Sequence, residues 1–337
     1  NEDALNMPVA ILNKPGAGGR VGWNWLATQA AADGYTLGAY NVPHFIAQSI
    51  EGGVSYSTES FEPIANWGAD PAVFVVAADS EFNSMADVVA YAKKNPGGMT
   101  FSGAGLFVGH HIAALQLEKA AGVKLAYIPN NAGGAGAMRA VIAGEVLGGV
   151  NNLSDAFRAR EAGTVKILGV FDLERNSFID DVPTMMEQGF DIDNASVNYR
   201  GVMVPSGTPQ PIIDRLAAIV PTMFENSRVA SRMAAGGSPM LIMNRDEVLE
   251  MWAQRQVTPS QSPISQAIGA GIAEVESIVA RARASQGVFE ASGSQLLYDR
   301  AAQAVAWAIM EPSRNKHLAE LAVETTGLGN VPDKITK

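Results

Sequence analysis

The stretch Met99–Ala121, which reads MTFSGAGLFVGHHIAALQLEKAA, contains the pattern that decides the fold class. It begins with a short run typical of a β-strand and continues through a glycine-rich turn. It ends in a segment whose apolar residues recur at helical spacing. A strand that feeds a helix through such a turn is a building unit of α/β proteins. The neighbouring sequence repeats this unit in both directions.

Strands and helices alternate along the chain up to about Gln254. Near the N-terminus, Val9–Leu12 predicts a strand, and the apolar positions of Arg20–Ala32 predict a helix that ends at Asp33–Gly34. The same signals predict strands at Tyr35–Tyr40, Ala72–Ala77, Tyr127–Pro129, Leu147–Val150 and Val165–Val170, and helices at Ser84–Lys94, capped by Ser84, and at Ala137–Ala143. We therefore expect an α/β fold with a mostly parallel sheet.

Length and composition exclude several classes of protein. A chain of 337 residues favours two or three compact domains, and 47% hydrophobic with 17% charged residues predicts globular structure. The formal net charge of -10 argues against nucleic acid or anionic lipid as a partner, because both need clustered Lys and Arg. The longest apolar run, Pro71–Ala78, is far shorter than the roughly 20 residues of a transmembrane helix, so we expect no direct membrane insertion.

Signals for catalysis and metal binding are few. The chain has no cysteine, which excludes thiolate nucleophiles, disulfides and cysteine-based metal sites in the sequence as given. None of its 4 histidines stands in an HExxH motif or at another metal-ligand spacing, and no GxSxG nucleophile motif is present. We therefore expect no metal, no cofactor and no enzymatic activity.

Two glycine-rich loops follow strands and precede helices. Phe101–Gly105 and Asn130–Gly134 each present backbone N–H groups next to a helix N-terminus, an arrangement that attracts carboxylates. Loops at the ends of neighbouring strands can face each other across a cleft, so the pair favours an anion-binding site. Phe101–Gly105 on its own is equally consistent with a structural turn. A third run, Pro15–Gly19, lacks the spacing of nucleotide-binding loops and is interpreted as a tight turn.

Polar residues near these loops are candidates for ligand contacts, each with a structural alternative. His110 can cap its helix or meet an anion, although a packed histidine is more common. Asn151–Ser154 can cap a helix or donate amide hydrogens, and Arg200 can bind a carboxylate bidentately or form a surface ion pair. The candidate ligand-binding residues are Ser102, Gly103, Ala104, Gly105, His110, Asn130, Asn131, Gly133, Gly134, Asn151, Asn152, Ser154 and Arg200. Hydrogen-bond donors of this kind suit holding an anion better than transforming it.

A set of short motifs in fixed order resembles one known family. The motifs are Asn13–Gly19 (NKPGAGG), Asp33–Leu37 (DGYTL), Asn95–Gly97 (NPG), Val182–Thr184 (VPT) with Glu187–Phe190 (EQGF), and Val204–Pro209 (VPSGTP). Over residues 5–255 the chain resembles the periplasmic substrate-binding proteins of tripartite tricarboxylate transporters, the TctC or Bug family.

The resemblance implies a two-domain periplasmic-binding-protein fold, the Venus flytrap, that closes over a small organic anion, a carboxylate or a sulfonate. It implies one domain from residues 1–100 and 201–255 and a second from residues 101–200, with the candidate residues lining the cleft. It also implies a periplasmic location and, as partners, the membrane components of the transporter.

The chain departs from the family pattern in two places. It starts just before the family's second strand, so we expect the fold to lack its first strand, and a signal peptide is not present in this sequence. Asn130 and Asn131 replace the aromatic and basic pair that usually follows the proline at position 129. The resemblance therefore does not transfer the identity of the ligand.

The C-terminal part has a different character. Residues 256–264 are expected to form a linker, because Thr258–Pro263 (TPSQSP) is rich in proline and serine. Residues 265–337 are expected to be all-helical, and Leu318–Asn330 (LAELAVETTGLGN) resembles the N-terminal start of an acylating aldehyde dehydrogenase of the sulfoacetaldehyde type. The alternative function is therefore a fragment or fusion of an NAD(P)-dependent aldehyde dehydrogenase without activity of its own. The lack of cysteine argues against an active dehydrogenase, whose nucleophile the resemblance implies to be a cysteine.

Overall fold

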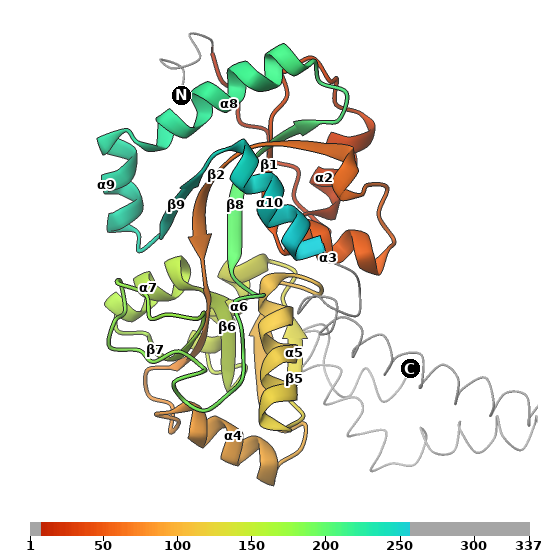
Figure 1. Ribbon diagram of the computed structural model, residues 1–337. Coiled ribbons are helices and arrows are strands. Elements are labelled where there is room, and N and C mark those ends of the chain that lie inside the picture. Colours follow the sequence, from red (N-terminus) through yellow and green to blue (C-terminus); the bar gives the residue numbers. More distant parts are fainter. Residues whose placement is uncertain (1–7, 257–337) are drawn as a thin grey trace, which may run out of the picture. The chain divides into compact units, whose positions relative to one another are not determined.

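The computed structural model describes residues 8–256. The chain divides into two compact units, Asn1–Gly271 and Ile272–Lys337, and all described residues belong to the first. Within this unit, one four-stranded and one five-stranded sheet are each packed against helices (Figure 1). We call the part around the four-stranded sheet lobe A and the part around the five-stranded sheet lobe B. The expected all-helical segment and residues 257–264 of the expected linker lie outside the described residues.

Lobe A is built on an antiparallel sheet. Its strands, in spatial order, are β1 (Gly38–Val42), β8 (Asn198–Pro205), β2 (Phe61–Asp70) and β9 (Met240–Met243). β8 pairs with both β1 and β2, and Tyr40 lies opposite Gly201. Only glycine fits at position 201, because a Cβ atom there would overlap the Tyr40 ring and the carbonyl oxygen of Ala65.

Helices cover both faces of this sheet. α8 packs its apolar side chains against one face, and an aromatic cluster that includes Trp23, Phe45 and Trp252 covers the other. Phe45 and Trp252 pack edge to face with ring centroids 4.8 Å apart. The helical elements of lobe A are η1 (Ala17–Gly19), α2 (Arg20–Thr28), α3 (His44–Glu51), η2 (Thr58–Ser60), α8 (Gln210–Phe224), α9 (Ser227–Ala235) and α10 (Arg245–Gln256).

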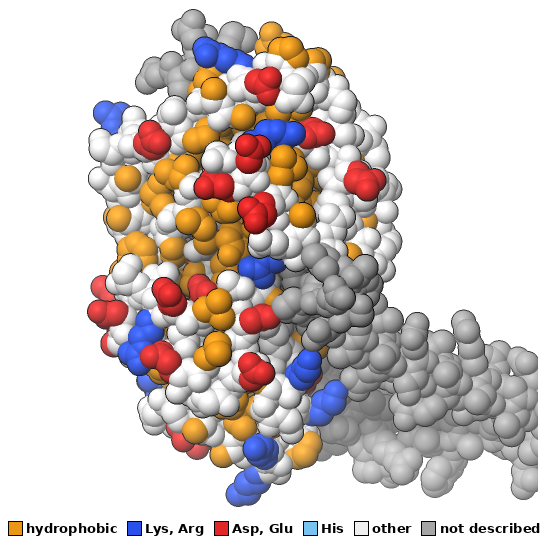
Figure 2. All heavy atoms as spheres, in the orientation of Figure 1, with side chains coloured by type: hydrophobic (Ala, Val, Ile, Leu, Met, Phe, Trp, Pro, Cys, Tyr) orange, Lys and Arg blue, Asp and Glu red, His pale blue; other side chains and the backbone are white. Residues whose placement is uncertain are grey.

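Apolar side chains gather on the surface of lobe A around β9 (Figure 2). Leu241 and Ile242 of this strand are 43% and 37% exposed. β9 is the last strand of its sheet, and β2 is its one partner among the described strands. With 4 residues, β9 offers only a short open edge, which limits pairing with other chains.

Lobe B contains a mixed sheet. Its strands, in spatial order, are β5 (Ala126–Pro129), β4 (Thr100–Gly103), β6 (Gly148–Asn152), β3 (Ala72–Ala77) and β7 (Val165–Phe171). β4 runs parallel to β5 and β6, whereas β3 runs antiparallel to β6 and β7. The expected mostly parallel sheet is therefore wrong for lobe A, whose strands pair antiparallel, whereas in lobe B β5, β4, β6 and β7 share one direction and β3 alone is reversed. The alternation of strands and helices along the sequence does not reveal that β3, which follows directly from β2 of lobe A, runs antiparallel to β6 and β7.

β3 is an interior strand of lobe B, between β6 and β7, and its sequence, AVFVVA, is apolar at every position. Alternate residues point to opposite faces of the sheet. Phe74 packs with residues of α4 and α5, whereas Val73 and Val75 pack with residues of α6 and α7. The helices of this lobe are α4 (Met85–Lys94), α5 (Gly109–Ala121), α6 (Gly133–Ile142) and α7 (Leu153–Glu161).

The repeated unit of strand, turn and helix is confirmed in lobe B. Met99–Ala121 contains β4 and α5, and Ser84 Oγ caps α4 by accepting a hydrogen bond from Asp87 N at 3.2 Å. The strand expected at Val9–Leu12 is wrong, because this segment forms no regular structure and Ile11 is 79% exposed. A strand needs a partner for its backbone groups, and none of the described strands pairs with these residues.

Within residues 8–256 the chain passes between the lobes twice. In the first passage, β2 ends at Asp70 and β3 begins at Ala72, so that only Pro71 lies between the two sheets. The second passage is residues 172–197, between β7 and β8. β3 and α4 pack in lobe B although they precede residue 100. The sequence marks the first passage only by Asp70–Pro71, a charged residue and a proline between the two strands.

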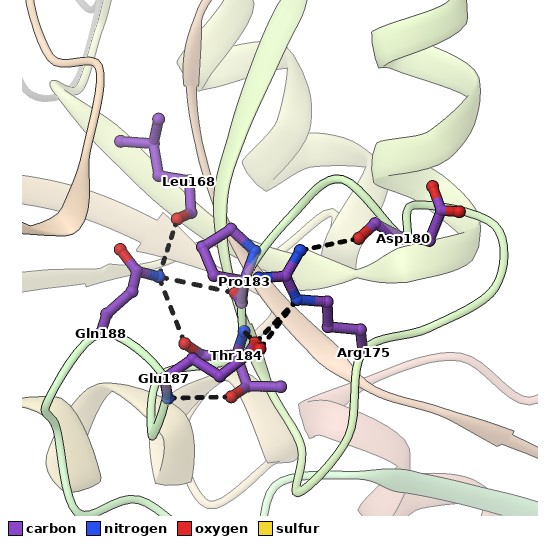
Figure 3. A network of polar contacts seen from close by, with 7 residues as sticks. All are labelled: Leu168, Arg175, Asp180, Pro183, Thr184, Glu187 and Gln188. Atoms are coloured by element: carbon purple, nitrogen blue, oxygen red, sulfur yellow. Dashed lines mark hydrogen bonds and ion pairs between the residues drawn. The ribbon is translucent and has the colours of Figure 1, made fainter.

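A polar network fixes the segment between β7 and β8 to lobe B (Figure 3). Gln188 Nε2 donates to the carbonyl oxygen of Leu168 at 3.0 Å. Glu187 accepts hydrogen bonds from Thr184 N at 2.8 Å and from Arg175 Nε at 2.9 Å, and its own N–H donates to Thr184 Oγ1 at 3.1 Å. The VPT and EQGF motifs therefore have a structural role, closing this segment onto β7.

Replacing Gln188 with Glu should lower the free energy of unfolding by about 2 kcal/mol, because a carboxylate would then face the carbonyl oxygen of Leu168. Urea denaturation followed by circular dichroism measures the change. The matched control is Gln29→Glu, the same exchange at an exposed side chain. It should change stability by less than about 0.5 kcal/mol. Equal stability of the two variants would show that the network does not hold the segment.

Candidate functional site

One buried carboxylate connects the two lobes. Asp70, the last residue of β2, is 1% exposed. Its Oδ1 accepts a hydrogen bond from Ser154 N at 3.1 Å, and its Oδ2 accepts one from Ser154 Oγ at 2.5 Å. Arg200 Nη1 lies 2.8 Å from the same Oδ2. Because Ser154 belongs to lobe B and Arg200 to lobe A, we call Asp70, Ser154 and Arg200 the interlobe latch.

The latch places a negative charge at the N-terminus of α7. Asn152 precedes this helix without capping it by its side chain, and the first N–H groups of a helix have no partner inside it. Asp70 therefore performs the capping role expected of Asn151–Ser154. Burial raises the pKa of Asp70, while the charge of Arg200 and the hydrogen bonds from Ser154 act against this rise.

His110 is held in its neutral form. It is 2% exposed, and burial lowers its pKa to about 4. The N–H of Ala104 donates to Nδ1 at 3.0 Å, so the proton of the neutral ring lies on Nε2. Nε2 is 3.1 Å from Oδ1 of Asn152. His110 thus joins the loop after β4 to the end of β6 and presents no charge to a ligand.

A second histidine meets α5 from lobe A. His44 is the first residue of α3, and burial lowers its pKa to about 3, with the protonated form of His110 and the charge of Arg200 acting in the same direction. A Cβ atom at Gly109, the first residue of α5, would lie 3.7 Å from Cε1 of His44 and 2.7 Å from the carbonyl oxygen of Ser196. Only glycine therefore fits at this contact between the lobes.

Polar atoms in this region are buried without a partner among residues 8–256. They are Nδ1 of His44, Oγ of Ser196, Oδ1 of Asn198 and, in β6, Oδ1 of Asn151. Asn198 Nδ2 lies 3.4 Å from the same Asn152 oxygen that His110 contacts. Buried polar groups in native proteins almost always have a partner, so these atoms point to a ligand or an ordered solvent molecule. We call the following set the junction site: His44, Gly109, His110, Ser196 and Asn198.

The glycine-rich run Pro15–Gly19 also lies next to lobe B. A Cβ atom at Gly18 would be 3.3 Å from Cγ1 of Val108 and 4.0 Å from the carbonyl oxygen of Leu106. The side chain of Gln48 donates to Gly18 O at 3.1 Å, which fixes the run in place. The interpretation as a tight turn therefore missed that this run borders the loop before α5.

Several predicted ligand residues lie where the lobes meet. His110 and Asn152 form a hydrogen bond, and Ser154 and Arg200 meet at Asp70. Gly134 lies beside them, since a Cβ atom there would be 3.5 Å from Cε1 of His110. The predicted residues of this group are Gly103, Ala104, Gly105, His110, Gly134, Asn151, Asn152, Ser154 and Arg200. Their roles in binding stay predictions.

Other predicted residues have local partners. Ser102 Oγ donates to the carbonyl oxygen of Ile128 at 3.0 Å, joining β4 to β5. Asn130 Oδ1 accepts from Ala132 N at 3.0 Å, as in an Asx turn. Asn131 is exposed, and Gly133 begins α6 with a φ of 69° that favours glycine. The contact of Asn130 and the backbone of Gly133 form the β5–α6 turn, and the partners named here do not belong to the junction site.

Several residues that build the site were not predicted from the sequence. Asp70 lies directly before Pro71 and the apolar strand AVFVVA. A carboxylate next to a buried strand needs buried partners, so this position in the sequence could have identified Asp70 as a site residue. His44, Ser196 and Asn198 give no such signal. They lie in short polar stretches that resemble ordinary loops.

The arrangement suits binding rather than chemical transformation. Arg200 is engaged by Asp70, and both buried histidines are neutral near pH 7. Hydrogen-bonding groups and helix dipoles, rather than free charges, therefore face the junction. Within residues 8–256, no group of acidic residues and histidines is arranged to hold a metal ion. No helix in that range is both long and apolar enough to span a membrane.

Comparisons with known proteins agree with the resemblance seen in the motifs. The model of the TctC family, "Tripartite tricarboxylate transporter family receptor", matches residues 1–269. A UPF0065 protein in the tcbD-tcbE intergenic region of Pseudomonas sp. (strain P51) is 28% identical over 251 residues, which cover 71% of this chain and 73% of that protein. The expected resemblance is thereby confirmed.

Solved structures share the fold. The periplasmic binding protein BugD matches with a TM-score of 0.70 at 27% identity, covering 80% of this chain and 89% of BugD. MatC from Rhodopseudomonas palustris, solved with bound malate, matches with a TM-score of 0.64 at 24% identity, covering 79% of this chain and 85% of MatC. The expected two-domain α/β fold is confirmed by these matches.

A separate similarity concerns a small part of the chain. An acylating sulfoacetaldehyde dehydrogenase of Cupriavidus necator is 52% identical over 79 residues, which cover 23% of this chain and 16% of the enzyme. This match agrees with the dehydrogenase resemblance expected near the C-terminus.

The interlobe latch should behave as a coupled pair. Asp70→Asn should lower the free energy of unfolding by about 3 kcal/mol, because Arg200 loses its counter-charge in a mostly buried position. Arg200→Met should also destabilise, and the double variant should lose less than the sum, with a coupling energy above about 1 kcal/mol. Urea denaturation measures all three. The exposed pair Arg160–Asp181 provides the control cycle, with coupling below about 1 kcal/mol. Additive losses at Asp70 and Arg200 would contradict the latch.

The neutral state of His110 predicts a pH dependence of stability. The folded-state pKa of about 4 lies below the ordinary 6.5, so between these values the unfolded chain takes up a proton that the folded chain does not. The stability contribution is therefore present above about pH 6.5 and is lost as the pH falls toward 4. His110→Gln, which cannot take up this proton, should lose less stability over that range. Urea denaturation at several pH values measures the loss for the unchanged protein and for His110→Gln. Equal losses of stability in the two proteins would contradict the prediction.

Proposed function

Because the chain belongs to the TctC family of tripartite tricarboxylate transporter receptors, we propose that it holds a small carboxylate at the junction of lobes A and B. Proteins of this family are periplasmic and bind solutes rather than transform them. The proposed activity is therefore capture of the anion in the periplasm and its delivery to the membrane components of the transporter.

The position of the α5 N-terminus carries this proposal. Gly109 begins α5 at the contact with His44 and Ser196, and no side chain caps the helix. The first N–H groups of a helix have no partner within it, and the helix dipole makes this end positive. A carboxylate at this point would accept hydrogen bonds from backbone groups, as anions do at other helix N-termini.

Neutral dipoles, rather than a free cation, would hold the anion. Arg200 already pairs with Asp70 at 2.8 Å, and burial keeps His44 and His110 uncharged. A carboxylate bound by amide and imidazole groups gains charge-assisted hydrogen bonds without a new salt bridge. Such a site can bind and also release its ligand, as delivery to a transporter requires.

Carboxylates are the first choice of ligand. The family description names tricarboxylates, and MatC was solved with the dicarboxylate malate. The oxygen atoms of a sulfonate can accept hydrogen bonds from the same N–H groups, so sulfonates form the second ligand class of this proposal. The dehydrogenase similarity supports no second function, because it covers only 16% of that enzyme.

Titration calorimetry of the full chain against dicarboxylates, tricarboxylates and sulfonates tests the proposal. At least one carboxylate should bind with a dissociation constant below about 1 mM, equivalent to about 4 kcal/mol. The absence of binding heat with every carboxylate would contradict the proposal. Binding of sulfonates alone would change the assigned ligand class from carboxylates to sulfonates.

A glycine variant ties binding to the junction. Gly109→Ala should weaken binding at least about tenfold, because its Cβ atom would lie 2.7 Å from the Ser196 carbonyl oxygen and would shift the start of α5. The matched control is Gly236→Ala, where the nearest atom is 3.5 Å away. Its affinity should equal that of the unchanged protein.

A further inference from the structure

The junction site contains a hydrogen-bond acceptor that no described residue satisfies. Asn198 is 3% exposed, and its Oδ1 is buried without a partner in residues 8–256. A buried acceptor left unpaired is costly, so native sites rarely leave one without a function. The atom lies in a region where His44 Nδ1 and Ser196 Oγ also lack partners. Their grouping at one contact between lobes distinguishes this region from isolated packing defects.

The hydrogen-bond network determines which atom of Asn198 is left over. The N–H of Ala104 donates to Nδ1 of His110, so Nε2 carries the proton and donates to Oδ1 of Asn152. That oxygen can only accept, and the atom of Asn198 facing it at 3.4 Å is therefore the donor Nδ2. The remaining atom, Oδ1, is fixed as an acceptor.

The neighbouring side chains of His44 and Ser196 can each donate or accept a hydrogen bond. They therefore do not change the requirement that Asn198 Oδ1 receive a hydrogen bond from a donor. Ser196 has a hydroxyl that can donate or accept, and the neutral ring of His44 can carry its proton on either nitrogen. Both can therefore serve the oxygen atoms of a carboxylate. Of the unpaired atoms in the junction site, only Asn198 Oδ1 requires a donor from its partner. Asn151 Oδ1, whose Nδ2 donates to the carbonyl oxygen of Gly134, is a second buried acceptor, but it lies beside Gly149 within lobe B.

We infer that the ligand carries, beside its carboxylates, a hydroxyl or amino group that donates a hydrogen bond to Oδ1 of Asn198. This inference rests on the proposed function and narrows its ligand class to hydroxy- or amino-carboxylates. An analogue that lacks the donor leaves the acceptor buried and unpaired. Sites built around such a hydrogen bond discriminate strongly against the analogue without it.

Matched ligand pairs test the inference by calorimetry on the full chain. L-malate and succinate differ by one hydroxyl group, as do citrate and tricarballylate, and L-aspartate and succinate differ by one amino group. In the pair that binds, the member with the donor should have a dissociation constant at least about tenfold lower. Equal affinities would overturn the inference and leave the proposed function standing, with an ordered water satisfying Asn198. Failure of every carboxylate to bind would overturn both.

Substitution of Asn198 tests whether its Oδ1 causes the preference for ligands with a hydroxyl or amino group. Asn198→Leu, of similar size, removes the acceptor, so the ratio of the two dissociation constants should fall to within about twofold of one. A ratio within one protein is insensitive to a general loss of stability. Asn198→Asp keeps an acceptor and should keep the ratio, even where its charge weakens both ligands. A preference that persists in Asn198→Leu would overturn the inference.

Discussion

The buried carboxylate of Asp70 is the constraint on which the arrangement of the two lobes depends. At 1% exposure the charge needs partners, and the chain supplies them from two directions, Ser154 in lobe B and Arg200 in lobe A. Satisfying both at once fixes the end of β2, the start of α7 and the start of β8 relative to one another. The end of β6, with Asn152, is thereby brought against His110 and Asn198.

The latch also sets the electrostatic character of the site. It pairs the charge of Arg200, and burial keeps the nearby histidines neutral, so the region where the lobes meet contains dipoles. Charged partners satisfy each other, whereas the polar atoms of Ser196 and Asn198 are left to interact with something else. Unsatisfied polar atoms at a binding site give it selectivity, because they discriminate between ligands of equal charge.

Local sequence signals predicted what local interactions determine. The strand and helix of Met99–Ala121 and the cap at Ser84 were predictable because the signals for each lie within one short segment: the turn glycines, the helical spacing of apolar residues and the capping serine. The antiparallel course of β3 and the latch were not, since Asp70 and Ser154 are 84 residues apart and neither has a local signal for the other. The candidate residues in the loops after β4 and β6 were found from their glycines and amides. His44, Ser196 and Asn198 were missed because the tertiary fold alone brings them to Gly109.

The single-residue passage at Pro71 has a mechanical consequence. Proline fixes its own φ, and it confines the residue before it to extended conformations, so the shorter of the two covalent links allows few torsional degrees of freedom. The longer link, residues 172–197, is fastened along β7 by Gln188. Any rotation of one lobe against the other is thereby reduced to a pivot beside Asp70. A ligand at the junction site would act close to that pivot, because Asn198 is two residues from Arg200 and its partner Asn152 is two residues from Ser154.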